Sequence, residues 1–212
     1  MNELAKALRD LDEDKVNKLV DAKLEQKVSP IEIINECNEG IVAVGDLFAA
    51  GKYFLTELMF SGEIMQGVMA KLEPLIAAKS TEGKIIGTVV IGTVSGDIHD
   101  IGKNIVVNLL RSHRFNVIDL GVDVPAEKFV EMVKTSGTKV LGLSALLNTT
   151  YPEMKNVIEA LKEAGIRDQV KVIIGGTVVS EAVREFTGAD AYANDALVGI
   201  NFCKSVYENN EA

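Results

Sequence analysis

The 212-residue sequence has few cysteines, few basic residues and no long apolar run. Cys37 and Cys203 are isolated thiols at no metal-ligand spacing, which favours a reducing compartment. Lys and Arg number 22 against 31 Asp and Glu, and the resulting net charge of −9 argues against binding to nucleic acid. No apolar stretch reaches membrane-spanning length, and the N-terminal residues do not resemble a signal peptide. We therefore expect a cytoplasmic protein with neither nucleic-acid nor membrane partners.

The first part of the chain contains no convincing strand. Apolar residues recur at helical spacing in four segments up to about Thr81. The third helix is predicted to begin at a capping Ser29 followed by Pro30, to carry Phe48 on its apolar face and to end at Gly51. Short connections between four helices indicate a small bundle, so residues 1–82 are expected to form a helical domain. Residues 79–84 are polar and are predicted to be a linker.

Residues 83–212 follow an alternating pattern of strands and helices. Strands are predicted near 85–94, 116–120, 139–144, 170–174 and 189–193, and helices near 102–113, 125–136, 151–164, 178–187 and 196–208. Such alternation predicts an α/β domain, a parallel sheet with helices on both faces and a ligand outside the carboxyl ends of its strands. Five strands favour a flavodoxin-like order.

One loop, after the first predicted strand, combines groups suited to chemistry. It consists of Gly96, Asp97, Ile98, His99, Asp100, Ile101 and Gly102. Asp97 lies two residues before His99, so its carboxylate can accept a hydrogen bond from one ring nitrogen. That bond fixes the tautomer and leaves the other nitrogen free for a metal. Gly102 lets the following helix begin close to a ligand above the loop.

Two further strand exits are rich in small residues. Ser144 follows the third predicted strand, and Gly175 and Gly176 follow the fourth, where the backbone can approach a ligand closely. From the residues alone, His99 can also be an ordinary loop histidine satisfied by Asp97. A zinc site is disfavoured because no other ligand is suitably placed. Phosphorylation of Asp97 is disfavoured because it needs neither the histidine nor the glycine.

These loops resemble the three motifs of cobalamin-binding domains, in the same order. The motifs are Asp97-x-His99-x-x-Gly102, Ser144-x-Leu146 and Gly175-Gly176. The segment from Asp119 to Pro125 resembles the exit of the family's second strand, and Phe54-Leu55 resembles the signature of its helical cap. The resemblance covers nearly the whole chain. It identifies the sequence with the small corrinoid proteins of methyltransferase systems, relatives of the cobalamin-binding region of methionine synthase.

The resemblance implies a role for each matching residue. His99 would be the lower axial ligand of cobalt in cobalamin, with its second ring nitrogen held by Asp97 and the relay extended by the Thr150 hydroxyl. The slot for the displaced nucleotide tail would be lined by Ser144, Gly175 and Gly176, with Asn148 beside them and Asn194 at the end of the tail. Leu146, in the second motif, would also contact the cofactor. Asn148 stands where the family usually has threonine, which leaves that single contact in doubt.

Other singled-out residues have mainly structural interpretations. Met59, Met65 and Met69 lie at roughly helical spacing and are predicted to pack in the bundle core. Phe54 and Met59, with Leu55, are also candidates to shield the upper face of the cofactor. His113 ends a predicted helix, where a cation complements the helix dipole.

The resemblance implies a methyl carrier, a subunit of a methyltransferase system rather than a complete enzyme. One partner, a substrate-specific methyltransferase, would supply a methyl group from an aryl methyl ether, methanol or a methylamine, forming methylcobalamin. A second would deliver it to tetrahydrofolate or a thiol, and a reductive activase would restore the cobalt. The cap would move aside about a hinge at residues 81–84. The alternatives are the small subunit of an adenosylcobalamin-dependent mutase, which normally lacks the helical cap, and a cobalamin sensor.

Overall fold

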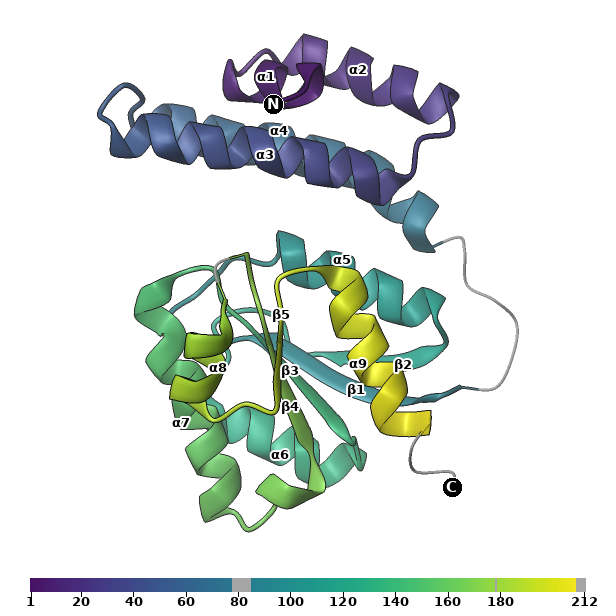
Figure 1. Cartoon of the computed structure of the whole chain (residues 1–212), viewed down its shortest axis with the longest axis vertical. Coiled ribbons are helices and arrows are strands. Elements are labelled where there is room, and N and C mark those ends of the chain that lie inside the picture. Colours follow the sequence, from purple (N-terminus) through teal and green to yellow (C-terminus); the bar gives the residue numbers. More distant parts are fainter. Residues whose placement is uncertain (78–84, 178, 209–212) are drawn as a thin grey trace. The chain divides into compact units, whose positions relative to one another are not determined.

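The structure is a computed structural model that describes residues 1–77, 85–177 and 179–208 (Figure 1). The chain divides into two compact units, Met1–Ala78 and Lys79–Ala212. The predicted linker at 79–84, with its proposed hinge at 81–84, lies outside the described residues. No helix in the described ranges is long and apolar enough to cross a membrane.

The N-terminal unit is formed by four helices, as predicted. They are α1 (Glu3–Arg9), α2 (Glu13–Glu25), α3 (Pro30–Ala49) and α4 (Leu55–Ala77). The side chains of Asn2 and Asp12 cap α1 and α2 by accepting backbone hydrogen bonds of 2.8 and 3.0 Å. At α3, Pro30 occupies the first turn, but the side chain of Ser29 makes no capping hydrogen bond, so this part of the prediction was wrong. The fixed backbone angle of proline favours the helix start without that bond.

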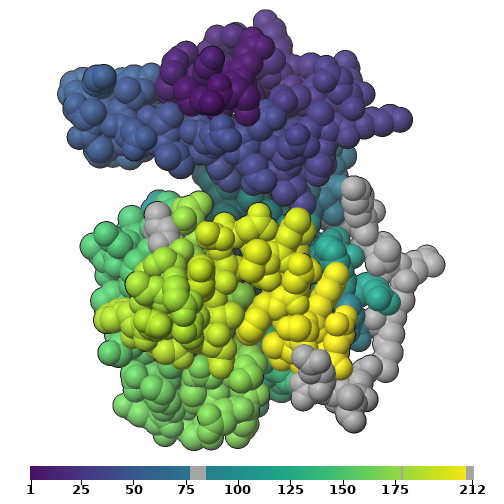
Figure 2. Space-filling model, in the orientation of Figure 1, coloured from purple at the N-terminus to yellow at the C-terminus, as the bar shows by residue number. Residues whose placement is uncertain are grey.

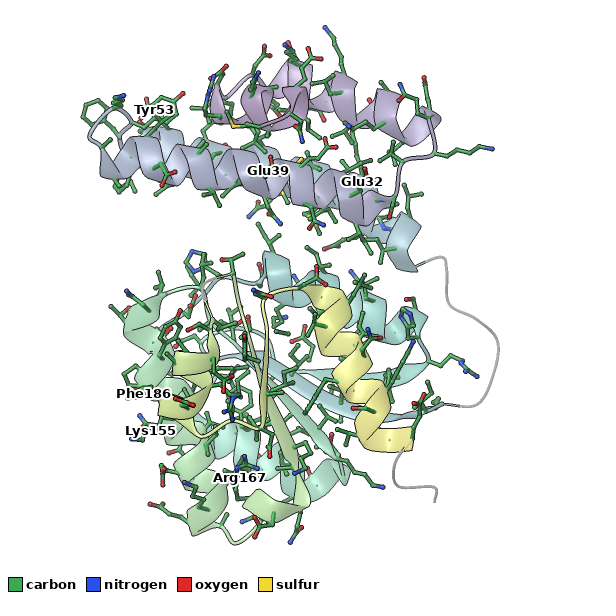
Figure 3. The ribbon with its side chains drawn as sticks, viewed as in Figure 1. Glu32, Glu39, Tyr53, Lys155, Arg167 and Phe186 are labelled. Carbon is green, nitrogen blue, oxygen red and sulfur yellow. The ribbon has the colours of Figure 1, made fainter. Side chains whose placement is uncertain are left out.

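The core of this unit lies between the four helices. Its fully buried side chains include Leu4, Leu8, Val16, Val20, Ile33, Ile34, Cys37, Met65 and Leu72. Gly40 permits the close crossing of α1 and α3, because a Cβ there would lie 2.7 Å from the carbonyl oxygen of Ala5. Tyr53, labelled in Figure 3, donates a 2.9 Å hydrogen bond to the carbonyl of Arg9. This bond ties the α3–α4 turn to the end of α1.

Two predicted packing roles in this unit were wrong. Met65 and Met69 are buried as expected, but the Met59 side chain is 60 % exposed. Phe48, assigned to the apolar face of α3, is 41 % exposed. Both residues lie toward the α3–α4 turn, near Phe54, which is also exposed. Helical spacing marks a face of a helix, but it does not show how far along the helix the neighbouring helices cover that face.

The second unit contains a five-stranded, all-parallel sheet of order β2-β1-β3-β4-β5, which confirms the predicted flavodoxin-like order. The strands are β1 (Gly87–Thr93), β2 (Phe115–Asp119), β3 (Val140–Ser144), β4 (Lys171–Gly175) and β5 (Ala191–Ala193). Val90 and Leu141 are paired in neighbouring strands and fully buried, as expected for a sheet covered on both faces. The chain reverses its direction of winding between β1 and β3, and such a switch point opens a crevice at the carboxyl ends of these strands.

Helices cover the sheet, as Figure 1 shows for this unit. They are α5 (Ile101–Ser112), α6 (Ala126–Ser136), α7 (Tyr151–Glu163), α8 (Glu181–Thr187) and α9 (Ala196–Glu208). α5 packs with α9, while α7 packs with both α6 and α8. Lys155 of α7 lies 5.2 Å from the ring centroid of Phe186 on α8 (Figure 3). The yellow and yellow-green residues that include α8 and α9 form much of the face of the second unit that is visible in Figure 2.

Candidate functional site

The exits of three adjacent strands meet at the carboxyl edge of the sheet. Ser144 at the end of β3 is paired with Thr93 at the end of β1 on one side and with Gly175 at the end of β4 on the other. The β1–α5, β3–α7 and β4–α8 loops therefore leave the sheet side by side. All three loops singled out in the sequence are brought together here, where α/β proteins bind ligands.

Asp97 is the structural centre of the β1–α5 loop. Its side chain is completely buried, and five donors point at its two carboxylate oxygens. Oδ1 accepts from the backbone N–H of His99 at 3.0 Å and from its ring Nδ1 at 2.6 Å. Oδ2 accepts from the backbone N–H groups of Leu146 at 2.7 Å and Leu147 at 3.0 Å, and more weakly from the Thr150 hydroxyl at 3.4 Å. The carboxylate thus joins the loops after β1 and β3.

These hydrogen bonds determine the ionisation of Asp97. Burial by itself raises the pKa of a carboxyl group, but hydrogen bonds from Leu147, His99 and Leu146 outweigh burial and lower the pKa of Asp97 to about 2. Asp97 is therefore an anion at neutral pH. An acceptor-only carboxylate requires the neutral His99 ring to carry its proton on Nδ1, so the lone pair of Nε2 is available.

His99 is presented to solvent by a loop that is held from both sides. Its side chain is 48 % exposed. The backbone carbonyl of His99 accepts a 3.0 Å hydrogen bond from the hydroxyl of buried Thr93 at the end of β1. With Asp97 holding both the backbone N–H and Nδ1, the imidazole is fixed in position and tautomer. Such a ring is suited to act as a single nitrogen ligand for a metal.

The surroundings of His99 favour a large apolar ligand. Exposed hydrophobic side chains follow three strand ends: Ile98 after β1 is 73 % exposed, Val122 after β2 is 38 % exposed, and Leu146 and Leu147 after β3 are both 40 % exposed. Gly102 adds space, since nothing lies within 4 Å of the position that its Cβ would take. Gathered apolar side chains around one polar group are typical of a cofactor site.

His99 Nε2 is a single available nitrogen donor at this edge of the sheet. No group of three or more His, Cys, Asp or Glu in the described parts of the chain is arranged to hold a metal ion. A metal already held by a macrocycle would need only one further nitrogen, and His99 could supply it. Asp100 and Ile101, also predicted in this site, lie at the start of α5, where Asp100 accepts a 3.1 Å hydrogen bond from Asn104.

Thr150 and Gly176 each make a close contact within the protein itself. The Thr150 hydroxyl donates a 2.7 Å hydrogen bond to the carbonyl of Leu147, shorter than the 3.4 Å separation from Asp97. Gly176 has φ +149°, and a Cβ there would lie 2.1 Å from the carbonyl oxygen of Ala145. The β4–α8 loop can approach the β3–α7 loop only because residue 176 is glycine. Gly175 has no such constraint, since its Cβ would make an ordinary 3.7 Å contact.

The remaining predicted residues lie at several places in the fold. Asn148 begins a short 3-10 helix after β3 and is exposed. Asn194 is exposed directly after β5, next to β4 at the same edge of the sheet. Phe54 and Met59 belong to the N-terminal unit and are 71 and 60 % exposed. His113 ends α5, and its Nδ1 lies 2.8 Å from the Leu109 carbonyl, a structural position as predicted.

Three residues that support the His99 loop were not predicted from the sequence. Thr93 appears in the sequence as one more β-branched residue of a buried strand. Lys103, whose side chain is 2 % exposed, forms a 2.6 Å ion pair with Asp119. Asp123 accepts a 2.8 Å hydrogen bond from the N–H of Gly96. Because a buried ammonium group requires an anionic partner, a lysine among the buried residues of a helix indicates that a carboxylate such as Asp119 lies nearby.

Comparison with known proteins identifies the class of the fold and site. Residues 87–201 match the family model of the B12 binding domain, and residues 1–73 match a second model described as a B12 binding domain. The chain is 42 % identical over 207 residues to dimethylamine corrinoid protein 1 of Methanosarcina mazei, covering 97 % of this chain and 95 % of the relative. It is 39 % identical over 201 residues to trimethylamine corrinoid protein 1 of Methanosarcina acetivorans, covering 94 and 93 %.

Solved structures agree with this class. The monomethylamine corrinoid protein of Methanosarcina barkeri matches with a TM-score of 0.87 and 34 % identity, covering 97 % of both chains. The methanol:cobalamin methyltransferase complex of the same species matches with a TM-score of 0.56 and 32 % identity, covering 97 % of this chain and 78 % of that chain. The chain is thus a cobalamin-binding protein. It belongs to the family of corrinoid proteins of methyltransferase systems.

Proposed function

We propose that this protein is the methyl-carrying subunit of a multicomponent methyltransferase, with His99 as the axial ligand of its cobalamin. One observation carries the proposal: the anionic Asp97 holds Nδ1 of His99 at 2.6 Å and leaves Nε2 free among apolar side chains at the sheet edge. The cobalt of the bound cofactor supplies the position that takes up and releases the methyl group. The protein would supply the His99 ligand, the Asp97 carboxylate that fixes its tautomer, and the apolar side chains around the cofactor.

Residues at the exits of four strands, β1, β3, β4 and β5, would divide the binding of the cofactor. Ile98, Leu146 and Gly102 would lie against the macrocycle around His99, supported by the exposure of the two side chains and the open space at the glycine. The slot for the nucleotide tail would be lined by Ser144, Asn148, Gly175, Gly176 and Asn194. The pairing of β3 with β4 and of β4 with β5 supports this assignment, because it aligns the exits that carry these residues.

Proton movement at the site would centre on Asp97. Nε2 of His99 would either ligate the cobalt or, when unligated, hold a proton, and Asp97 would stabilise the imidazolium across the 2.6 Å bond. Thr150 would take part less directly than the sequence predicts. Its single hydroxyl proton would be shared between the Leu147 carbonyl at 2.7 Å and Asp97 Oδ2 at 3.4 Å, and the shorter bond would take the larger share.

The proposal includes two domains and several partner enzymes. Residues 1–82 would be a cap and residues 83–212 the cofactor domain, supported by family matches at 1–73 and 87–201. Exposed Phe54 and Met59 would shield the upper face of the cofactor. A substrate-specific methyltransferase would load the methyl group, a second would pass it to tetrahydrofolate or a thiol, and an activase would reduce the cobalt. The two buried free cysteines support a reducing cytoplasm.

The names of the relatives bear on the methyl donor. They favour methylamines and methanol, and an aryl methyl ether stays in the proposal as a third class. The relatives named for dimethylamine and for trimethylamine have nearly the same sequence identity to this chain, 42 and 39 %. We therefore propose that the partner methyltransferase determines the methyl donor, and each of the three donor classes must be tested. The mutase alternative is not favoured, because these relatives are corrinoid proteins along nearly their whole length.

The axial ligand can be tested by electron paramagnetic resonance of the Co(II) protein. In protein labelled with ¹⁵N-histidine, an imidazole ligand gives doublet nitrogen splitting, whereas the cofactor's own benzimidazole keeps triplets. We expect doublets in the wild type and in His113→Ala, which removes the only other histidine, and their loss in His99→Ala. Triplets in the labelled wild type would disprove ligation by His99. Methyl transfer is then tested with partner methyltransferases and methylamines, methanol and an aryl methyl ether.

A further inference from the structure

The loop that carries His99 is held by the connection between β2 and α6. Asp123 Oδ1 in this connection accepts a 2.8 Å hydrogen bond from the N–H of Gly96 and lies 3.3 Å from the hydroxyl of Ser95. The N–H of Asp123 donates to the backbone carbonyl of Asp97 at 3.0 Å. One residue thus contacts three consecutive positions of the His99 loop.

The end of β2, directly before this connection, holds the far end of that loop. Asp119, the last residue of β2, forms a 2.6 Å ion pair with the buried Lys103 in the first turn of α5. Its other oxygen accepts a 2.9 Å hydrogen bond from the N–H of Gly121 and so orders the turn that leads to Asp123. The β1–α5 loop is therefore fixed at both ends by aspartates of a neighbouring strand exit.

The backbone at Asp123 indicates that this arrangement has a cost. Its φ is +53°, in the left-handed region that favours glycine, and Gly96 opposite has φ +78°. Aspartate tolerates this conformation better than most residues, but it gains no core packing here, because it is exposed. Its side-chain hydrogen bonds all go to the His99 loop.

We propose that Asp123 is a positioning residue for the axial ligand: it holds the β1–α5 loop so that Nε2 of His99 is presented at a fixed height above the sheet edge. This inference rests on the proposed role of His99. Asp97 orients the ring within the loop, whereas Asp123 fixes the loop to the sheet. Without the Asp123 carboxylate, Gly96 and Ser95 would bond to water, and the loop would sample more positions.

The test compares His99-ligated fractions in cobalamin-loaded, ¹⁵N-histidine-labelled Co(II) protein. We expect Asp123→Ala and Asp123→Gly to lower the ratio of ligated to unligated cobalt about threefold to tenfold, the factor that corresponds to one net hydrogen bond. Asp123→Asn keeps an acceptor oxygen, so its ratio of ligated to unligated cobalt should be close to that of the wild type. Asp123→Gly guards against misfolding, because glycine adopts φ +53° without strain.

Asp190→Ala is the matched control. Asp190 accepts a 2.7 Å bond from the N–H of Val172 and pairs with Arg167 at 2.8 Å, away from the His99 loop (Figure 3 labels Arg167). The Asp190→Ala substitution should leave the ratio of ligated to unligated cobalt unchanged. In cofactor-free protein, Asp123→Ala should speed amide exchange at Gly96 and His99, and Asp190→Ala should not.

The outcomes separate this inference from the proposed function. If His99→Ala abolishes the doublets but both Asp123→Ala and Asp123→Gly keep the wild-type ratio, the positioning role is disproved while ligation stands. If the wild type lacks doublets, the proposed function fails first. A drop in the ratio with Asp190→Ala equal to that with Asp123→Ala would also overturn the inference, because a general loss of stability would then explain both.

Discussion

Replacing Asp97 with asparagine keeps the size of a fully buried side chain and removes its charge. Five donors point at the two carboxylate oxygens, and an amide offers one acceptor oxygen and one NH₂ group in their place. The substituted side chain must therefore turn its NH₂ group either toward the N–H groups of Leu146 and Leu147 or toward His99. The two orientations have different consequences.

In the first orientation, the N–H groups of Leu146 and Leu147 lose their acceptor. Each buried, unpaired donor costs about 1–3 kcal/mol, so the free energy of unfolding should fall by roughly 2–6 kcal/mol. In the second orientation, the NH₂ group faces Nδ1 of His99, which must then accept. The ring proton moves to Nε2, and the nitrogen proposed to bind cobalt is blocked. Asp97→Asn should therefore weaken either the fold or the ligation.

Two measurements separate these outcomes. Urea unfolding followed by circular dichroism gives the loss of stability, and the ¹⁵N-histidine doublet of the Co(II) protein gives the ligation. Glu159→Gln on α7 is the control, because it removes a charge from an exposed pair with Lys162 and should change stability by less than about 0.5 kcal/mol. An Asp97→Asn protein as stable as the wild type and with full doublet intensity would refute this reasoning.

Three further predictions concern stability. The pKa of Asp97 in the folded protein is about 2, below the ordinary 3.8, so the ionised carboxylate stabilises the fold above about pH 4. The difference between these two pKa values corresponds to about 2 kcal/mol. This contribution is lost as the pH falls toward 2. Urea midpoints measured between pH 6 and pH 2.5 should fall more steeply in the wild type than in Asp97→Asn; equal slopes would contradict this. Gly176→Ala should cost about 2–4 kcal/mol in urea unfolding, because its φ is +149° and its Cβ would lie 2.1 Å from the Ala145 carbonyl oxygen. Met65→Ala should cost about 2–5 kcal/mol and Met59→Ala less than about 0.5 kcal/mol by the same assay, since the first side chain is 1 % and the second 60 % exposed. Similar losses for both methionines would show that α4 packs differently.

The sheet could be predicted from the sequence because its strands are buried on both faces. Parallel strands covered by helices appear as short apolar runs, and the predicted run at 85–94 contains β1 at Gly87–Thr93. Asp97 and His99 could be paired in advance, because a carboxylate two residues away can reach the ring within one loop. In these cases, the interacting groups are neighbours in the sequence.

Contacts between distant segments could not be predicted in this way. Asp97 meets the N–H of Leu146, 49 residues later, only because β1 pairs with β3, and backbone donors leave no mark in a sequence. The Thr93 hydroxyl donates a hydrogen bond to the His99 carbonyl. In the sequence, this threonine is indistinguishable from any β-branched residue that favours a strand. The exposure of Met59 depends on how far along α4 the other helices reach, and apolar spacing does not encode that distance.

The burial of Asp97 connects the sheet to the chemistry of the site. A carboxylate without solvent persists as an anion only if hydrogen bonds replace its hydration, and two of its donors come from the exit of β3. Those N–H groups reach Asp97 only when Thr93 and Ser144 are in register at the ends of β1 and β3. If the register were lost, Asp97 would take up a proton or turn to water, and His99 would no longer be held in one tautomer. The nitrogen of His99 that is proposed as the ligand is therefore prepared by the pairing of two strands, and no contact from a cofactor is needed to select its tautomer.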